Sequence, residues 1–453
     1  MRIKSMGSNQ DDRDIVLFLG AGFSCDVGFP TMAMFGDDSK AELRELRKQM
    51  DQRQDRKTSS MLRDAGRVFT AFQEYCRKGA DMVSMDVDNM ETVFCIAEAM
   101  SEAEFNPEIN LAPGGEIAVQ SGRPEEPLTF PADTLLKQIQ MWLWDIYQGL
   151  PPLNKDHRRY AQLRPRVCEE FLQFLNSNPW RKRTTVLSTN YDLVVEYYTW
   201  AMSGFKCGYP FAEGCDYMTL QAGPATWDSY LNTRCAMSNP HHESDVLLLC
   251  KLHGSVNFFE LGSSGGPRLG ICDDIAVMGQ TIGNSRVPRY DPPPSHESGM
   301  SEDTRKRRPA IFVQDAIWSL RERYGSSLVP AIIPPTYAKL QRQPWLRRTW
   351  NRAFRAIKQA KLLIFIGYSM PESDGFMRAM IQGALASRTE SGPEVYVVNP
   401  FKTPGDGPSE PDEQRYKSLF PTLGGKDPKG IVREKFADAW QKGLIREIFE
   451  SKY

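Results

Sequence analysis

The chain has 453 residues, of which 41% are hydrophobic and 25% are charged. This length predicts two or three structural units, and the composition is that of an ordinary globular protein. The 57 acidic and 56 basic side chains leave a formal net charge of -1, which excludes a general electrostatic attraction to nucleic acid or to an anionic membrane.

The first fourteen residues are polar, and the longest apolar runs are too short to cross a bilayer. Nine cysteines occur without any C-x-x-C pair, so we expect a cytoplasmic protein with reduced thiols. The spacing of Cys235, His241, His242 and Cys250 fits no common zinc pattern, and we therefore predict no metal site.

Short apolar runs rich in β-branched or aromatic residues predict the buried strands of a parallel sheet. The first four runs end in a Gly, Asn or His motif, and open α/β sheets bind ligands beyond the carboxyl ends of their strands. The expected fold is α/β, with a Rossmann-like parallel sheet, a large helical insertion and a helical C-terminal tail. The predicted strands are Ile15–Leu19, Thr185–Ser188, Val246–Leu249, Leu362–Ile366 and Val395–Val398.

The first strand leads into Gly20-Ala21-Gly22-Phe23-Ser24, and Gly28-Phe29-Pro30 follows closely. Glycines at a strand end let the backbone approach a pyrophosphate, while N–H groups at the next helix start face the anion. The alternative is a tight strand-to-helix turn without a ligand. The full G-x-G-x-x-G pattern and the Walker lysine are both missing, so neither a standard dehydrogenase nor a P-loop ATPase fits.

About 165 residues separate the first two strands, and helical patterns dominate them. We interpret residues 36–180 as a helical insertion or cap, and residues 1–35 with 181–403 as the core. A stretch rich in Pro, Gly and Glu, Asn106–Pro131, is predicted to be a loop. The predicted helices are Ser39–Gln54, Asn89–Met100, Leu135–Tyr147 and Val167–Leu175.

The second strand leads into Thr189-Asn190-Tyr191-Asp192. Asn190 and Asp192 could contact a ribose with an amide and a carboxylate, but the same residue types commonly cap helices. Both interpretations stay open at this point.

The third strand leads into Lys251-Leu252-His253-Gly254-Ser255. Histidine is the side chain best suited to accept a proton near neutral pH, and a strand end beside a glycine is a suitable place for a general base. The alternative is a hydrogen-bonded structural histidine. The segment that follows, Gly262–Arg308, is dense in Gly, Ser, Pro and charge and is predicted to be irregular.

The fourth strand leads into Gly367-Tyr368-Ser369-Met370-Pro371, with Ser373-Asp374 directly behind. Glycine and serine can hold phosphate or ribose oxygens, and Asp374 could cap a helix that begins near Gly375. Asn399-Pro400 ends the fifth strand, where the amide binds an adenosine hydroxyl or starts a turn. Residues 404–453 form the predicted tail, in which Gly430–Glu450 has an amphipathic helical pattern.

Taken in this order, the motifs resemble the sirtuin superfamily, in particular its bacterial sirtuin-like branch of NAD-consuming defence proteins. The resemblance covers about residues 14–34 and 184–401. Its matching pieces are Gly20-Ala21-Gly22-Phe23-Ser24, Gly28-Phe29-Pro30, Thr189-Asn190-Tyr191-Asp192, Leu252-His253-Gly254-Ser255, Pro334-Pro335-Thr336-Tyr337, Gly367-Tyr368-Ser369 with Ser373-Asp374, and Asn399-Pro400.

The resemblance implies that NAD+ is the substrate. It implies that the first glycine turn holds the NAD phosphates, that Asn190 and Asp192 lie near the nicotinamide ribose, and that His253 is the base. The implied catalytic residues are Asn190 and His253; the implied cofactor-binding residues are Gly20, Ala21, Gly22, Ser24, Asp192, Gly367, Ser369 and Asn399.

Two departures from the protein-deacylating sirtuins favour simple hydrolysis. The four zinc-binding cysteines of those enzymes are missing, and Pro30-Thr31-Met32-Ala33 stands where they usually carry Pro-Asp-Phe-Arg. The expected function is therefore an NAD+ hydrolase, an effector of bacterial antiphage defence. The alternatives are an NAD-dependent protein deacylase and a non-catalytic module that senses NAD or ADP-ribose. No Asp/Glu cluster of metal-site pattern supports a nuclease.

Continuous loss of NAD would harm the host, so the resemblance implies a gated enzyme. It implies a homo-oligomer that acts alone or with a partner, such as a HerA-type ATPase, a short Argonaute or a phage-derived activator. The helical insertion and the tail are the expected places for that control.

Overall fold

The computed structural model describes the sheet, the helices that cover it and parts of the insertion. Several predictions lie outside the described residues, namely the helix Ser39–Gln54, the motif Pro334-Pro335-Thr336-Tyr337, and the residues Gly28, Pro30 and Ser373. The described residues are 13–27, 29, 68–69, 71–77, 90–102, 108–111, 128–147, 164–177, 179–203, 207–210, 217–220, 246–261, 268–272, 276–279, 309–312, 328–333, 344–371, 374–389, 391–401, 411–423 and 430–451.

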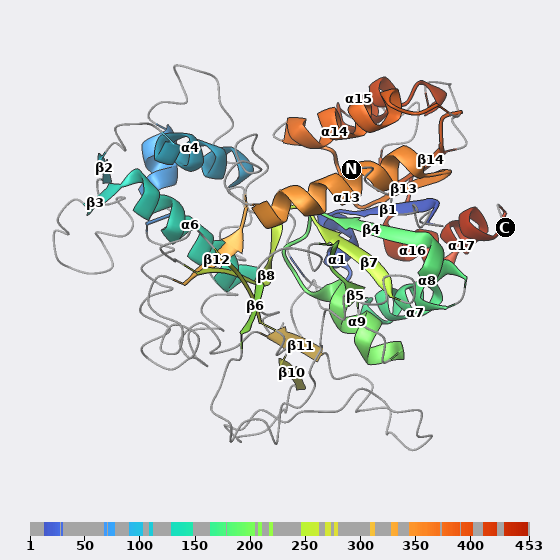
Figure 1. Cartoon of the computed structure of the whole chain (residues 1–453), viewed down its shortest axis with the longest axis horizontal. Coiled ribbons are helices and arrows are strands. Elements are labelled where there is room, and N and C mark those ends of the chain that lie inside the picture. The colour runs from blue at the N-terminus through green and yellow to red at the C-terminus, as the bar shows by residue number, and fades with distance from the viewer. Residues whose placement is uncertain are drawn as a thin grey trace, which may run out of the picture.

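A seven-stranded sheet in which every pair of neighbours is parallel forms the centre of the described fold (Figure 1). This confirms the predicted α/β, Rossmann-like fold, and all five predicted strands belong to this sheet. In spatial order the strands are β15 (Ile431–Val432), β14 (Glu394–Val398), β13 (Leu362–Ile366), β1 (Ile15–Leu19), β4 (Thr184–Ser188), β7 (Leu247–Lys251) and β5 (Cys207–Gly208).

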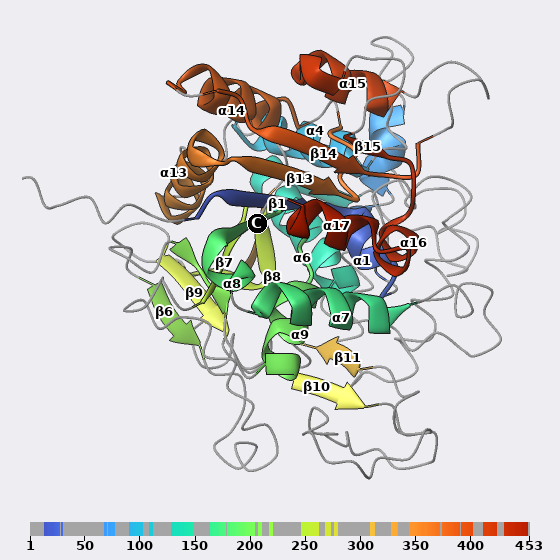
Figure 2. The same cartoon turned by 90° about the vertical axis from the view of Figure 1, so that its right-hand side faces the viewer.

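Helices cover both faces of this sheet, as its uniformly apolar strands require. Figure 2 shows α13 (Pro344–Gln359) and α14 (Gly375–Ala386) on one face, and α7 (Pro165–Asn176) and α9 (Val194–Ser203) on the other. The short helix α1 (Ala21–Cys25) lies on the α7 side. None of the helices that the structure describes is both long and apolar enough to cross a bilayer.

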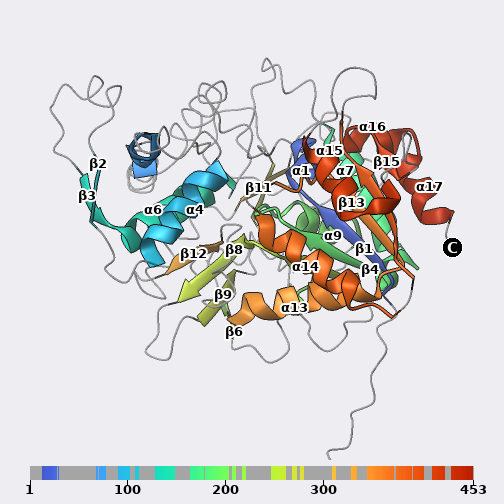
Figure 3. The same cartoon turned by 90° about the horizontal axis from the view of Figure 1, so that it is seen from above.

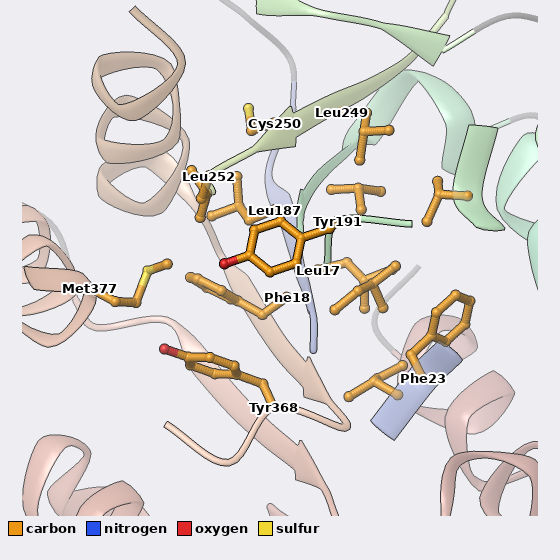
Figure 4. Packing of buried hydrophobic residues seen from close by; sticks show 14 of the residues in the cluster. Leu17, Phe18, Phe23, Leu187, Tyr191, Leu249, Cys250, Leu252, Tyr368 and Met377 are labelled. Carbon is orange, nitrogen blue, oxygen red and sulfur yellow. The ribbon is translucent and has the colours of Figure 1, made fainter. Parts of the chain in front are cut away.

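The core is continuous across neighbouring strands (Figure 4). Leu17 of β1, Leu187 of β4 and Leu249 of β7 are fully buried. The rings of Phe18 and Phe365 stack at 4.3 Å between β1 and β13. At roughly 1.5–3 kcal/mol for each large apolar side chain, this burial is the main contribution to stability.

The insertion includes a helix pair and a hairpin that lie to one side of the large sheet (Figure 3). The pair is α4 (Met90–Glu102) and α6 (Ala132–Tyr147), and the hairpin is β2 (Glu108–Leu111) with β3 (Leu128–Pro131). The prediction of a loop over the whole of Asn106–Pro131 was therefore wrong at the two hairpin strands.

A second sheet lies between the helix pair and the large sheet, in the order β12-β8-β9-β6. Part of it falls within Gly262–Arg308, so the prediction of an irregular region was wrong there. Short strands with distant partners carry little periodicity, which is why their sequences gave no signal. These strands are β6 (Tyr217–Leu220), β8 (Gly254–Leu261), β9 (Arg268–Cys272) and β12 (Val329–Ile332), with the separate pair β10 (Ala276–Gly279) and β11 (Pro309–Phe312).

The predicted insertion and tail both contact the core. Phe171 of α7 packs edge-on against Phe23 of the core at 5.9 Å, and against Phe436 and Trp440 of the tail at 5.2 and 5.3 Å. Strand β15 pairs with β14 beyond the predicted boundary at residue 403, so the helix predicted over Gly430–Glu450 was wrong at its start. The remaining elements are α8 (Trp180–Arg183), α15 (Pro411–Leu419), η7 (Pro421–Leu423), α16 (Phe436–Gln441) and α17 (Leu444–Glu450). The three-part division of the chain stays a prediction.

Candidate functional site

Four neighbouring strands of the large sheet end at the same level. Leu19 at the end of β1 is in register with Ile366 of β13 and with Ser188 of β4, and Ser188 is in register with Lys251 of β7. The motifs that follow these strands are therefore neighbours at the carboxyl edge, where parallel α/β sheets bind ligands.

The glycine turns after β1 and β13 pack directly against each other. The N–H of Gly20 donates to Ile366 O at 3.0 Å, and that of Gly22 donates to Gly367 O at 2.9 Å. Gly367 has a φ of +61°, and a Cβ there would lie 2.4 Å from Phe23 N. These glycines permit a close backbone approach whether or not a ligand is bound.

This packing reduces the number of backbone N–H groups in the turn that can donate to a phosphate. Since Gly20 and Gly22 use their N–H groups within the protein, Ala21 is the backbone donor on which that contact depends. The phosphate role of the three residues stays a prediction.

Asn190 bridges the β1 and β4 turns. Its Nδ2 donates to Gly20 O at 2.9 Å and to Ser24 Oγ at 3.0 Å, and only 7% of the residue is exposed. An amide nitrogen has two hydrogens, and these two bonds use both. The carbonyl oxygen is therefore the end of Asn190 that is left to a ligand, and it accepts hydrogen bonds.

Asp192 is buried, and its Oδ1 accepts the N–H of Val194 at 3.0 Å. This is the helix-cap role that the alternative interpretation gave it, at the start of α9. The carboxylate also accepts a hydrogen bond from the hydroxyl of Ser24. Burial raises the pKa of Asp192, while the nearby ammonium of Lys251 opposes that rise. A contact between Asp192 and a ribose stays a prediction.

His253 follows β7 and is 4% exposed. Its Nε2 lies 3.3 Å from Oδ2 of Asp374, and the hydroxyl of Tyr368 donates to the same oxygen at 2.7 Å. A carboxylate held in this way orients an imidazole for proton transfer.

The backbone around His253 is fixed from three directions. The indole N–H of Trp350 donates to Leu252 O and the N–H of Ile333 donates to His253 O, both at 2.9 Å. Gly254 has a φ of +80°, and a Cβ there would lie 1.8 Å from Ala331 O. Only glycine fits this position, so His253 has a rigid support.

Asp374 was predicted only as a helix cap. Helix α14 does begin at Gly375, but the Asp374 side chain makes no capping hydrogen bond and turns toward His253 instead. Asp374 and His253 are 121 residues apart in the sequence, so no local pattern could predict that they form a pair. The available signal was the position of Asp374 behind a strand-end motif.

The turn after β13 is held from outside the sheet. Asn399 Nδ2 and the hydroxyl of Tyr416 both donate to Tyr368 O at 2.7 Å. Ser369 is exposed, whereas Met370 is buried with a φ of 53°, a strained conformation for a residue with a side chain. Asn399 thus supports the turn, and its contact with an adenosine, like that of Gly367 and Ser369, stays a prediction.

Within the described part of the chain, no three His, Cys, Asp or Glu side chains come close enough to hold a metal ion. Cys250 is buried and forms no disulfide with another described cysteine. Cys235, His241 and His242 lie outside the described residues.

No family model matches the sequence, and no curated protein does so. Among solved structures, the chain is similar to a Sir2 homologue mutant bound to ADP-ribose, with 10% identity, a TM-score of 0.35, and coverage of 96% of this chain and 92% of the other. A second Sir2 homologue mutant with ADP-ribose gives 12% identity and a TM-score of 0.36 with the same coverages. A Sir2 homologue bound to NAD gives 11% identity, a TM-score of 0.34, and coverages of 96% and 90%. With TM-scores this low, we infer nothing about this chain from these likenesses.

Proposed function

We propose that this chain binds NAD+ at the carboxyl edge of the large sheet and hydrolyses the bond between nicotinamide and ribose. One observation carries the proposal: an acceptor amide, Asn190, and an imidazole paired with a carboxylate, His253 with Asp374, follow adjacent strands β4 and β7. The glycine turn after β1 lies beside them, because Asn190 binds Gly20.

Each group has a definite task in this reaction. The bond between ribose C1′ and the nicotinamide nitrogen breaks, and its electron pair leaves with the nicotinamide, which becomes neutral. The oxygen of a water molecule bonds to C1′, and His253 accepts the proton that this water loses. The Asn190 carbonyl accepts a hydrogen bond from the water or a ribose hydroxyl. A positioned base of this kind contributes about 10²–10⁴-fold.

The test is to incubate the purified full chain with NAD+ and to measure nicotinamide and ADP-ribose by chromatography. We expect release by the active protein and a fall of about 10²-fold or more in His253→Ala. Glu394→Gln, at an exposed side chain of β14, is the control and keeps the wild-type rate. Undiminished release by His253→Ala contradicts the proposal, and NAD+ consumption only with an acylated peptide would identify a deacylase instead.

We further infer that the enzyme is gated and acts in the bacterial cytoplasm as an effector of antiphage defence. The sequence resemblance supports this inference, as does the position of α6 in the insertion. Gln140 donates to Ile332 O at 3.0 Å and Trp144 donates to Val256 O at 2.7 Å. Helix α6 therefore binds β8, which begins directly after His253, and β12, which ends next to Ile333, the residue that donates to His253 O. A change in the insertion therefore has a short route to the base.

A homo-oligomer, a HerA-type ATPase, a short Argonaute or a phage-derived activator would supply the signal. The test is to compare NAD+ turnover by the isolated chain with turnover after adding each candidate. Full turnover by a monomeric, partner-free sample would contradict the gating.

A further inference from the structure

A chain of buried polar groups runs behind Asn190. Lys251 Nζ donates to the backbone oxygen of Asp192 and lies 3.5 Å from Glu196 Oε1. The hydroxyl of Tyr209 donates to Glu196 Oε1 at 2.9 Å. Lys251, Glu196, Asp192 and Tyr209 are all between 1% and 3% exposed. Burying this many ionisable groups costs free energy, which a functional role of the arrangement would explain.

The directions of the hydrogen bonds around Ser24 are fixed by chemistry. A hydroxyl has one hydrogen, and the hydrogen of Ser24 goes to the carboxylate of Asp192, which can only accept while it is ionised. Ser24 Oγ is therefore an acceptor toward Asn190, 3.0 Å away. The Asn190 end that faces Ser24 must be its NH2 group.

We infer that Ser24 and Asp192 are positioning residues that hold the Asn190 amide in one direction, with its oxygen toward the ligand. This assigns Asp192 to the support of Asn190 instead of to a ribose. The inference rests on the proposed function, since it concerns the same amide.

Lys251 maintains this direction. Burial raises the pKa of both Asp192 and Glu196, and the Lys251 ammonium is the opposing charge for both carboxylates. If Asp192 took up a proton, it would donate to Ser24, and the Ser24 hydroxyl would turn its own hydrogen toward the Asn190 NH2 group. The bond between Asn190 and Ser24 would then be lost, and Gly20 O would be the one remaining acceptor that holds the amide. Lys251 thus influences Asn190 through two hydrogen bonds, from Ser24 to Asp192 and from Asn190 to Ser24.

The direct test observes the amide itself. In the full-length protein labelled with 15N-asparagine, the two side-chain amide protons of Asn190 are assigned by their loss in Asn190→Asp. We expect both protons to exchange slowly with solvent in the wild type, because both are bonded inside the protein. In Asp192→Asn the signals should move and exchange faster, because a carboxamide can donate to Ser24 and reverse the bonding.

Ser24→Ala is the second variant, and it should change the same two signals by removing the acceptor. Glu394→Gln, an isosteric loss of charge on an exposed side chain of β14, is the control that leaves them unchanged. Unchanged signals in both Asp192→Asn and Ser24→Ala would overturn the inference, whether or not the protein hydrolyses NAD+. If one variant fails to fold, the other decides.

Kinetics give a second, separable readout. Both variants should lower kcat for NAD+ by about ten- to a hundred-fold, the scale of one hydrogen bond to a charged group, while KM changes little. Loss through KM alone would assign Asp192 to ligand binding and overturn the inference. Absence of NAD+ hydrolysis in the wild type would refute the proposed function, while the amide signals would still test the positioning.

Discussion

At the residue scale, the contact between Asp374 and His253 is the feature that best separates a catalytic base from a histidine with a structural role. Asp374→Asn keeps the size and shape of the side chain but removes the negative charge that faces His253 Nε2. We expect NAD+ turnover to fall at least about tenfold, a part of the ~10²–10⁴-fold that a positioned base contributes. Turnover is measured by nicotinamide release.

Tyr368→Phe is the graded control for that variant. It removes the 2.7 Å hydrogen bond to Asp374 Oδ2 but keeps the carboxylate charge. Its loss of turnover should be smaller than that of Asp374→Asn. The reverse order, or no effect of either variant, would mean that Asp374 does not act on His253.

The raised pKa of Asp26 predicts that the stability of the protein depends on pH. Burial raises this pKa from 3.8 to about 6, and Asp26 Oδ2 accepts the N–H of Ala437 at 3.2 Å. A raised pKa means that the folded state binds the proton more tightly than the unfolded state does. The stability contribution of Asp26 is therefore full below about pH 4 and is lost as the pH rises through about 6.

Asp26→Asn carries no charge at any pH, so it escapes that loss. We expect its Tm to exceed the wild-type Tm at pH 8, and the difference to shrink as the pH falls toward 4. Thermal unfolding followed by circular dichroism at several pH values measures this. A difference that is the same at every pH would show that the Asp26 charge is not the cause.

At the element scale, the fit between the two glycine turns is a structural requirement. A Cβ at Gly367 would lie 2.4 Å from Phe23 N, and the residue also has a positive φ. We expect Gly367→Ala to lower the free energy of unfolding by at least about 1–2 kcal/mol. Urea unfolding measures it.

Gly392→Ala is the matched control, because no atom lies within 4 Å of a Cβ there. Its free energy of unfolding should stay within about 0.5 kcal/mol of the wild type. Equal losses in the two variants would contradict the close approach of the turns.

The C-terminal helices belong to the same packing unit as the sheet. Trp440 is buried and contacts Phe171 and Phe174 at 5.3 and 5.6 Å. Trp440→Ala should destabilise the whole protein by about 3–5 kcal/mol in urea unfolding. Tyr75→Ala, at a ring that is 40% exposed, is the control with a smaller effect. Loss of only the tail's signal, with the main transition unchanged, would show that the tail folds separately.

The sequence predicted the elements that carry their own pattern. The five central strands are continuous apolar runs, and strands buried on both faces need such runs. Strand β15 has only two residues, and the strands of the second sheet depend on partners far along the chain, so no local pattern reveals them. The amphipathic pattern of Gly430–Glu450 identified α16 and α17 but extended the helical prediction too far.

Some residues of the candidate site could be predicted from the sequence and others could not, for the same reason. Asn190 and His253 could be predicted because each directly follows a strand that the sequence reveals. Asp374 and Lys251 could not, because their partners lie 121 and 59 residues away. The bonding within Asn190, Ser24 and Asp192 likewise appears only once three motifs have been brought together.

At the scale of the whole molecule, we propose that the turns after β1, β4 and β7 form a single dinucleotide site. A crystal structure of the wild-type protein with ADP-ribose tests this most directly, because the product stays intact. We expect the terminal ribose within hydrogen-bond distance of the Asn190 oxygen and the His253 imidazole, with the pyrophosphate beside Ala21. ADP-ribose bound at another place, with Asn190 and His253 away from it, would contradict the claim.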